Sequence, residues 1–324
     1  MIPVLAKLGP FDPADALIVA LVVFLLALAW RRAARALGEE VPPLTAAGVL
    51  FNLVVSVVVA AAVVYLVNRF GPVEIKAYGL MLVLGFSAAT AWCIHAGAQR
   101  GYAATVWLDV VLYVLIGAII GARLVYVLLD WRDYSSQVGQ TLALWQGGLS
   151  FHGGVAGGLL AGAIYAWRSR QSLLKLSDVA APSIALGYAF GRIGCFLNGC
   201  CYGTPTDLPW GVVFPQAVGA DGAPITAPVH PTQLYGVLAS LAIFALLVRL
   251  SGHLRRPGHP LLAYLVLYSI YRFPLEYLRR GVTAVPLSFL PELTVGQFAS
   301  AIVAVAALVT MAVTWPRGGK GDAK

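Results

Sequence analysis

Long apolar runs alternate with short polar, basic or proline-rich connections along almost the whole chain. A membrane-spanning α-helix needs roughly 20 mainly apolar residues. We predict nine such helices, over residues 14–36, 45–68, 77–98, 105–129, 148–167, 178–197, 231–250, 260–279 and 294–315. The pattern is therefore typical of an all-α polytopic membrane protein.

The composition agrees with this fold class and excludes a large soluble domain. Hydrophobic residues make up 60% of the chain and charged residues 11%, whereas soluble domains have about 25% charged residues. The net charge of +8 indicates basic cytoplasmic loops in a membrane protein, rather than nucleic-acid binding. No basic segment precedes the first apolar run, so we expect no cleavable signal peptide.

The distribution of lysine and arginine over the short loops predicts the orientation. Alternate loops, including residues 168–175 and the tail 316–324, hold more than twice as many basic residues as the loops on the other side. The basic side is expected to be cytoplasmic, which places the C-terminus inside and the N-terminus outside. The loop 204–230 has several prolines and no lysine or arginine, so we predict a small extracytoplasmic cap there.

Three arginines remain inside or at the ends of apolar segments: Arg123, Arg192 and Arg272. An ionisable residue within the membrane is costly and indicates a functional site. Arg272 and Glu276 are spaced i,i+4, so one helix face presents both, and a structural ion pair accounts for these two alone. Three buried cations need more negative charge than one glutamate supplies. A bound phosphate group supplies that charge and accepts bidentate arginine contacts.

The stretch 191–203 places Arg192 beside Asn198 and three cysteines, Cys195, Cys200 and Cys201. Three interpretations of the cysteines stay open: small buried apolar residues, a thiol–disulfide pair, or a metal site. As a zinc site the group is one ligand short, and two of its members are adjacent. We therefore predict no metal and no cofactor.

Glycines dominate the segment 153–162, a composition that allows two helices to approach closely. His152 precedes these glycines, at the point where the loop becomes the helix. A histidine there is either a hydrogen-bonded packing residue or an accessible side chain on the same side as Arg192, and both interpretations stay open.

Together these stretches resemble the bacterial phosphatidylglycerol–prolipoprotein diacylglyceryl transferase family, over residues 73–315. The matching motifs are residues 77–81, residues 121–126 with Arg123, residues 147–154 with His152, residues 191–203, residues 208–215, residues 230–235, and the late helix with Tyr268, Arg272, Glu276 and Arg279. Family members usually carry asparagine at the position of Cys195, glutamate at Cys200 and an acidic residue at Gly236.

The resemblance implies a seven-helix transferase-like membrane domain over residues 73–315 of a bacterial cytoplasmic (inner) membrane protein. Residues 1–72 are then a two-helix N-terminal extension, and residues 316–324 a cytoplasmic tail. The implied reaction moves a diacylglyceryl group from phosphatidylglycerol to the lipobox cysteine in the signal peptide of a preprolipoprotein. A thioether forms and glycerol phosphate leaves.

The resemblance also implies roles for individual residues. Arg192 and Arg272 are expected to bind the phosphate, and His152 is expected to act as the base or to orient the lipid. Further substrate-binding residues are expected to be Tyr78, Arg123, Asn198, Gly203, Tyr268, Glu276 and Arg279. The implied partners are the lipid, the preprolipoprotein and the bilayer, with no nucleic acid.

Other functions remain as alternatives at this point. One is a divergent paralogue with another acceptor. A second is a membrane thiol–disulfide oxidoreductase that uses Cys200 and Cys201. A third is a lipid binder or transporter without catalysis, because arginines within the membrane also line transport paths.

Overall fold

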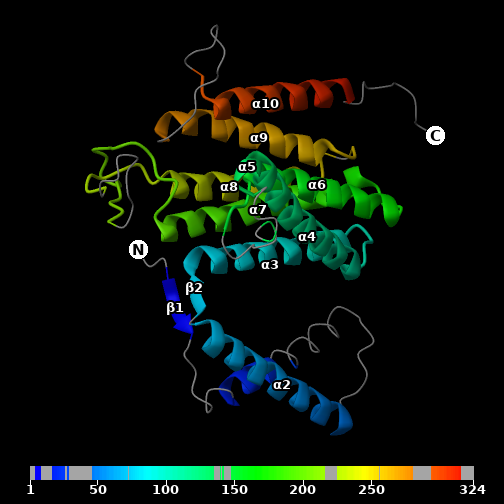
Figure 1. Ribbon diagram of the computed structural model, residues 1–324. Coiled ribbons are helices and arrows are strands. Elements are labelled where there is room, and N and C mark those ends of the chain that lie inside the picture. Colours follow the sequence, from blue (N-terminus) through cyan, green and yellow to red (C-terminus); the bar gives the residue numbers. More distant parts are fainter. Residues whose placement is uncertain are drawn as a thin grey trace, which may run out of the picture. The chain divides into compact units, whose positions relative to one another are not determined.

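The computed structural model describes residues 4–8, 17–25, 28, 46–71, 73–134, 139, 141, 147–215, 225–254, 256–279 and 293–314 (Figure 1). The chain forms two compact units, Met1–Leu80 and Met81–Lys324. The predicted division at residue 72, between an extension and a transferase-like domain, stays a prediction. The predicted tail 316–324 lies outside the described residues.

The first unit contains a long helix, α2 (Ala46–Phe70), and a two-stranded antiparallel sheet of β1 (Val4–Leu8) and β2 (Val73–Lys76). Gly71 ends α2 with a φ of 98°, and its backbone N–H donates to the carbonyl of Val67, as glycine commonly does beyond a helix. Residues 17–25 and 28 are helical within the predicted helix 14–36, and the rest of that segment lies outside the described residues.

Helices make up the second unit, which confirms the all-α membrane class. They are α3 (Ala77–Ala98, which begins in the first unit), α4 (Ala104–Leu129), α5 (Trp131–Tyr134), α6 (Phe151–Arg168), α7 (Leu173–Asn198), α8 (Thr232–Leu250), α9 (His259–Leu275), the 3₁₀ turn η3 (Glu276–Leu278) and α10 (Val295–Thr314).

Six helices of the described chain are long and apolar enough to cross a membrane: α2, α3, α4, α7, α8 and α10. Helices α6 and α9 overlap the predicted spans 148–167 and 260–279, but neither belongs to these six. The protein is a multi-pass membrane protein, and the number of nine crossings stays a prediction.

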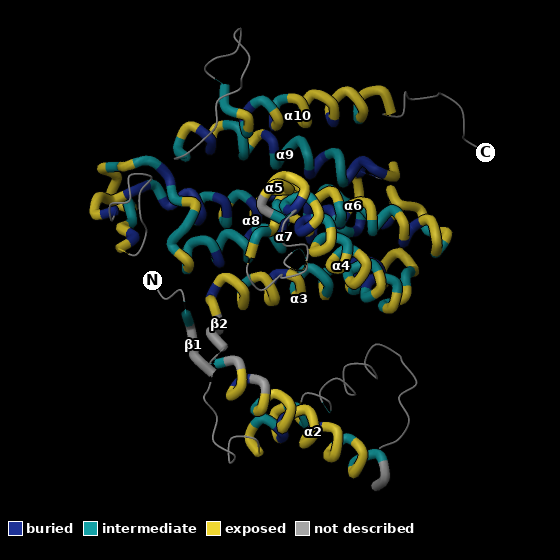
Figure 2. Tube along the Cα trace, in the orientation of Figure 1, coloured by how far each residue is buried: buried dark blue, intermediate teal, exposed yellow. Residues whose placement is uncertain are grey.

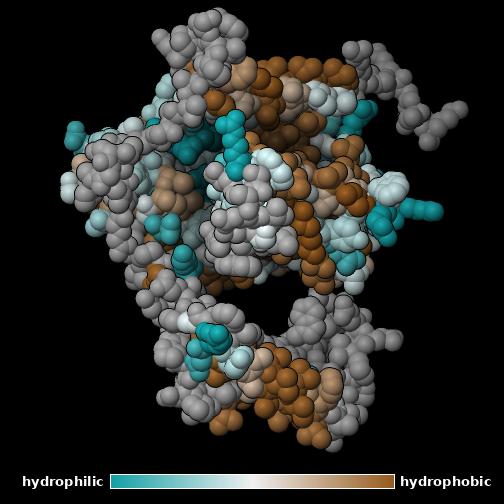
Figure 3. Space-filling view, in the orientation of Figure 1, coloured by the Kyte–Doolittle hydropathy of each residue, from teal (hydrophilic) through white to brown (hydrophobic). Residues whose placement is uncertain are grey.

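The outer surfaces of the helices are apolar, as contact with lipid requires. On α10, the side chains of Val305, Leu308 and Val309 are each more than half exposed. On α2, the side chains of Val54 and Val58 are also more than half exposed. Figure 2 shows these helices largely exposed, and Figure 3 shows hydrophobic side chains gathered over them. A water-soluble protein rarely exposes so much contiguous apolar surface.

Helices α4 and α6 cross at glycines. A Cβ atom on Gly121 or Gly157 would collide with backbone of the facing helix, so only glycine allows this approach. The predicted role of the glycine-rich segment 153–162 in helix packing is therefore confirmed. The crossing also fixes the start of α6, since the N–H of Ser150 donates to the carbonyl of Ala122 at 3.0 Å.

Helix α7 packs against α8 and α9, and α9 packs against α10 (Figure 1). The shared core includes Ala185 on α7, Leu247 on α8 and Tyr264 on α9. Because α7 and α9 end where α8 and α10 begin, four helix termini meet at one end of this unit. We call this end, formed by residues 191–206, 229–236, 268–279 and 293–297, the arginine end.

The loop after α7 has a small core of its own. Phe214, Ile225 and Val229 are buried together, and the backbones of Val212 and Val229 exchange two hydrogen bonds, of 3.0 and 3.1 Å. The described parts of the predicted cap 204–230 therefore form an ordered lobe beside the arginine end.

Candidate active site

Arg192 lies in the last turns of α7 against an aromatic ring. The guanidinium carbon is 4.7 Å from the centroid of the Tyr188 ring, one turn earlier on the same helix. Tyr188 in turn contacts the Tyr268 ring of α9 edge-on, with 5.5 Å between centroids. A cation over an aromatic face gains electrostatic energy without losing its charge, so this arginine is held in place while remaining able to bind an anion.

Two tyrosines of α9 link Arg192 to Arg272. The ring centroids of Tyr268 and Tyr271 are 6.1 Å apart. The hydroxyl of Tyr271, the residue directly before Arg272, and the side chain of Arg192 lie beside the same glycine of α8. The structure thus brings Arg192 and Arg272 together although 79 positions separate them in the sequence. Tyr188 and Tyr271 were not among the predicted site residues. Their spacing was the available signal, since Tyr188 precedes Arg192 by one helical turn and Tyr271 precedes Arg272 directly.

Gly236, on the first turns of α8, makes room for this group. A Cβ atom there would lie 2.8 Å from the Tyr271 hydroxyl and 3.1 Å from Cγ of Arg192. A larger side chain at this position therefore requires one of the two neighbours to move. The absence of a side chain at position 236 leaves the space that Arg192 and Tyr271 occupy.

Glu276 is the acidic partner of the cluster. Its side chain is only 5% exposed, and its carboxylate forms ion pairs with Arg272 and, at 3.4 Å, with Arg279. The carboxylate also lies against Gly296 in the first turn of α10. A helix N-terminus carries partial positive charge and favours an anion.

The start of α10 is fixed by reciprocal hydrogen bonds. The N–H of Gln297 donates to Oγ1 of Thr294 at 3.1 Å, and the N–H of Thr294 donates to Oε1 of Gln297 at 3.0 Å. This is a capping box, which satisfies two backbone donors at a helix N-terminus. It holds the first turn of α10 against Glu276.

The cluster carries an excess of positive charge. Within the described part of the chain, the ion pairs of Arg272 and Arg279 are both with Glu276, and Arg192 contacts the ring of Tyr188. Three guanidinium groups and one carboxylate leave two positive charges. Since desolvated cations need a counter-charge, the arginine end is suited to bind an anion.

Gly203 and Arg279 connect the cap to this cluster through the backbone. The two residues form an antiparallel bridge, and the N–H of Gly203 donates to the carbonyl of His230 at 2.9 Å. A Cβ atom at Gly203 would collide with the carbonyl of Leu278. The predicted substrate-binding residue Gly203 is thus a crossing point of chain segments, and its contact with substrate stays a prediction.

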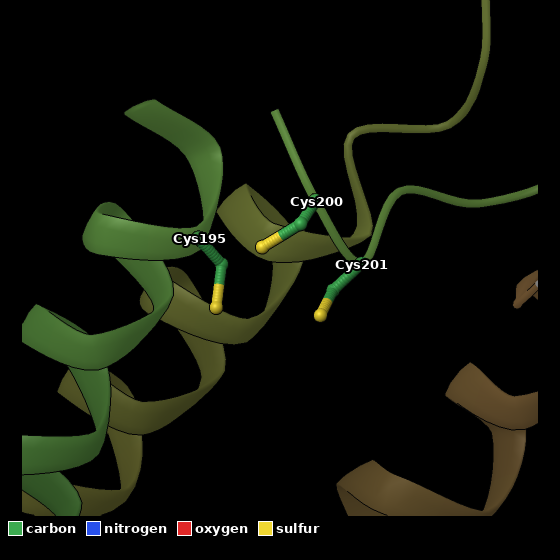
Figure 4. A group of neighbouring side chains, drawn as sticks. All are labelled: Cys195, Cys200 and Cys201. Atoms are coloured by element: carbon green, nitrogen blue, oxygen red, sulfur yellow. The ribbon is translucent and has the colours of Figure 1, made fainter. Parts of the chain in front are cut away.

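Asn198 is the last residue of α7 and is exposed. Gly199 then reverses the chain with a φ of 70°, and Cys200 and Cys201 follow. The sulfur atoms of these two cysteines and of Cys195 all lie within 4.8 Å of one another, and Figure 4 shows the three side chains directed into the same space.

The Cys201 thiol lies where positive charge reaches it. Hydrogen bonds from the Cys195 and Cys200 thiols, and then the charges of Arg192 and Arg279, lower the pKa of the Cys201 thiol. Arg192 and Arg279 are both members of the arginine cluster. The cysteine group therefore lies next to this cluster.

Arg123 and His152 belong to a second group, at α4 and the start of α6. The buried Arg123 donates to the carbonyls of Thr141, Gly147 and Gly148 at 2.7 to 3.0 Å, so it fixes the loop that leads into α6. His152 is exposed in the first turn of α6. Among the described residues, no hydrogen bond, ion pair or ring contact joins His152 to Arg192 or Arg272, and the expected proximity of these residues stays a prediction.

An apolar groove of about 380 Å³ lies beside Arg123 on the outer face of α4. Its lining includes Ile120, Leu124 and Trp131. Tyr78, the remaining predicted residue, is the second residue of α3; it is partly exposed and belongs to the first unit.

Comparison with known proteins decides the family. The family model described as prolipoprotein diacylglyceryl transferase matches residues 65–313. The chain belongs to the prolipoprotein diacylglyceryl transferase family. The resemblance inferred from the sequence motifs is therefore confirmed.

Individual relatives carry the same name. A protein of Gloeobacter violaceus named phosphatidylglycerol–prolipoprotein diacylglyceryl transferase is 38% identical over 217 residues, covering 66% of this chain and 81% of that protein. One from Geobacter sulfurreducens is 37% identical over 229 residues, covering 68% and 85%. A second transferase of this name from Clostridium perfringens is 29% identical over 248 residues, covering 76% and 94%.

The ion-pair cluster predicts a specific pattern of stability. We expect Glu276→Gln to lower the free energy of unfolding by about 3 kcal/mol, because it removes a buried carboxylate and leaves the partly exposed Arg272 and Arg279 without their anion. The double variant Arg272→Gln/Glu276→Gln is expected to lose less than the two single variants combined. Thermal unfolding in detergent measures both effects, and the exposed Asp207→Asn serves as control. Wild-type stability of Glu276→Gln would contradict the assigned role of this carboxylate.

Proposed function

We propose that this chain transfers a diacylglyceryl group from phosphatidylglycerol to the lipobox cysteine of a preprolipoprotein. The observation that carries the proposal is the arginine end itself, where Arg272 and Arg279 share the carboxylate of Glu276 and Arg192 lies over the ring of Tyr188. An anionic lipid headgroup supplies the missing negative charge. The printed names of the relatives, which mention the same lipid and the same class of protein, support this proposal.

The chemistry is a substitution at a glyceryl carbon. The sulfur of the acceptor thiol forms a bond to this carbon while the bond from the carbon to the phosphate oxygen breaks. The thiol proton goes to a base, and the electron pair of the broken bond stays on the departing glycerol phosphate. Because an unperturbed cysteine thiol has a pKa of about 8.5, a base or a positive field must promote its ionisation.

Arg192 and Arg272 bind the phosphate in this proposal. Fixed cations aimed at a leaving group stabilise the charge that develops on it, and this is usually the largest catalytic contribution. Glu276 holds Arg272 and Arg279 in position. Tyr268 contacts Tyr188, which carries Arg192, and Tyr271, which precedes Arg272, and it lines the headgroup site together with Asn198.

His152 accepts the thiol proton or orients the lipid. The apolar groove beside Arg123 suits an acyl chain, since it opens on the surface that faces the bilayer. The arginine end faces the extracytoplasmic side in this proposal, in agreement with the positive-inside distribution of the loop charges. That orientation gives a translocated signal peptide access to the site.

The alternatives have weaker support. A thiol–disulfide oxidoreductase requires Cys200 and Cys201 to react with each other, and no relative reported above carries such a name. A transport path requires charged residues along its length, whereas the described cluster lies at one end of the unit. The proposed transfer uses the cysteine of the substrate and needs none of the enzyme's own.

Removing either phosphate-binding arginine is expected to abolish transfer. We expect Arg192→Ala and Arg272→Ala each to lower the rate by at least about 100-fold, as the loss of one preorganised donor does elsewhere. The assay uses phosphatidylglycerol vesicles and a lipobox peptide, with product detected by mass.

Two further variants make this result interpretable. Arg249→Ala changes an exposed arginine at the opposite end of α8 and is expected to retain activity. Arg192→Lys keeps the charge but loses the planar fork, so it is expected to retain only part of the rate. Normal transfer by both alanine variants would overturn the phosphate assignment.

His152→Gln separates chemistry from packing. We expect folded protein in normal yield and a rate reduced by at least about 100-fold, in the range typical of a lost general base. Raising the assay pH is expected to restore part of the rate, because it ionises the acceptor thiol without help. Loss of folded protein would instead assign His152 a packing role, and an unchanged rate would remove it from the reaction.

A further inference from the structure

The three cysteines at the end of α7 form a cluster that the proposed transfer does not use. Cys195 is in the last helical turn, and Cys200 and Cys201 follow the reversal at Gly199. All three are free thiols, and their exposure increases from half-buried Cys195 and Cys200 to exposed Cys201. The cluster is therefore reachable from outside the protein.

The backbone around the cluster is fixed by buried side chains. Nε2 of Gln233 donates to the carbonyl of Cys200 and Oγ1 of Thr232 donates to the carbonyl of Cys201, both at 2.8 Å. Cys201 has a φ of 63°, a conformation uncommon for a residue other than glycine and often found at functional sites. The direction of the sulfur atoms is thus set by the fold.

The spacing of the sulfurs suits one metal ion. Thiolates bind zinc at about 2.3 Å, so three sulfurs around one ion lie roughly 4 Å apart. The observed group, within 4.8 Å, needs to close by less than about 1 Å to reach that geometry. A disulfide requires two sulfurs to approach to about 2.05 Å, a much larger change.

Charge also favours occupation of the cluster. Three thiolates and a divalent ion together carry one negative charge. Arg192 lies one turn before Cys195 on α7, and Arg279 pairs with Gly203, two residues after Cys201. The arginines therefore stabilise the loaded cluster. Thiolate ligands select soft ions over magnesium or calcium.

We propose that Cys195, Cys200 and Cys201 bind a single soft divalent metal ion, Zn²⁺ by preference, with a fourth position open to water. The cysteines take no part in the proposed transfer, and the test of this site requires no substrate. The sequence led us to predict no metal, because the group is one ligand short of a zinc site and two of its members are adjacent. The structure adds that the three sulfurs converge.

Titration of the reduced, detergent-purified protein with Cd²⁺ tests the proposal. We expect one equivalent to bind with a sulfur-to-metal charge-transfer absorbance, and Zn²⁺ in excess to compete for the same site, because thiolates prefer the softer Cd²⁺. Cys195→Ser, Cys200→Ser and Cys201→Ser are each expected to weaken binding by at least about 10-fold, since even the loss of an outer partner costs this much. Cys93→Ser is the matched control, since it removes the fourth cysteine, which is buried against Ser183.

A second measurement uses the wild-type protein and does not depend on how the variants fold. Zn²⁺ is expected to protect the three clustered thiols from alkylation, as counted by mass, and a chelator is expected to restore their reaction. Absence of the charge-transfer absorbance, unchanged Cd²⁺ binding in all three variants, or equal weakening by Cys93→Ser would overturn the proposal. A disulfide within the cluster, combined with failure of the reduced protein to bind metal, would also overturn it.

Discussion

Hydrocarbon does not solvate a guanidinium group, and this constraint governs the arginine end of the protein. Arg272 and Arg279 share the buried carboxylate of Glu276, and Arg192 lies over the ring of Tyr188. The helix ends are arranged to keep these groups together. The first turn of α10 supports the carboxylate, and the turn η3 at the end of α9 directs Arg279 toward the cap.

The same arrangement explains why an anionic lipid is a suitable ligand. A site with complete charge balance gains little from a phosphate, whereas a site with excess positive charge gains a great deal. Arg192 lies over the ring of Tyr188 on α7, and this ring packs edge-on against Tyr268 of α9. The fold thus fixes the positions of the charges before substrate arrives, which is what electrostatic catalysis requires.

Sequence patterns were sufficient for the long helices of the second unit and for the pairing of Arg272 with Glu276. Residues 77–98 were predicted with the observed ends, and residues 231–250 differ from α8 by one position. Helix α7 begins five residues earlier than predicted, because Ser172 caps it and the charged residues Lys175 and Asp178 interrupt the apolar pattern. The carboxylate of Asp178 accepts the N–H of Gly258, a contact between distant parts of the chain.

Long-range contacts account for what sequence patterns missed. The pairing of β1 with β2 joins strands more than 60 positions apart, and neither short strand carries a strong local signal. The role of Tyr271, the room provided by Gly236 and the convergence of the three sulfurs all arise where α7, α8 and α9 end together. Motif spacing predicted that Arg192 and Arg272 share one site, but only the packing of α7 against α9 reveals the ring contacts that run from Tyr188 through Tyr268 to Tyr271.

The most direct test of the central claim is reconstitution of the purified protein with a lipobox peptide and vesicles. The account predicts that the peptide gains the mass of one diacylglyceryl group with phosphatidylglycerol, that glycerol phosphate is released in equal amount, and that a peptide with serine in place of the cysteine gains nothing. Folded protein that leaves the cysteine peptide unmodified, or that transfers equally well from phosphatidylcholine, would contradict it.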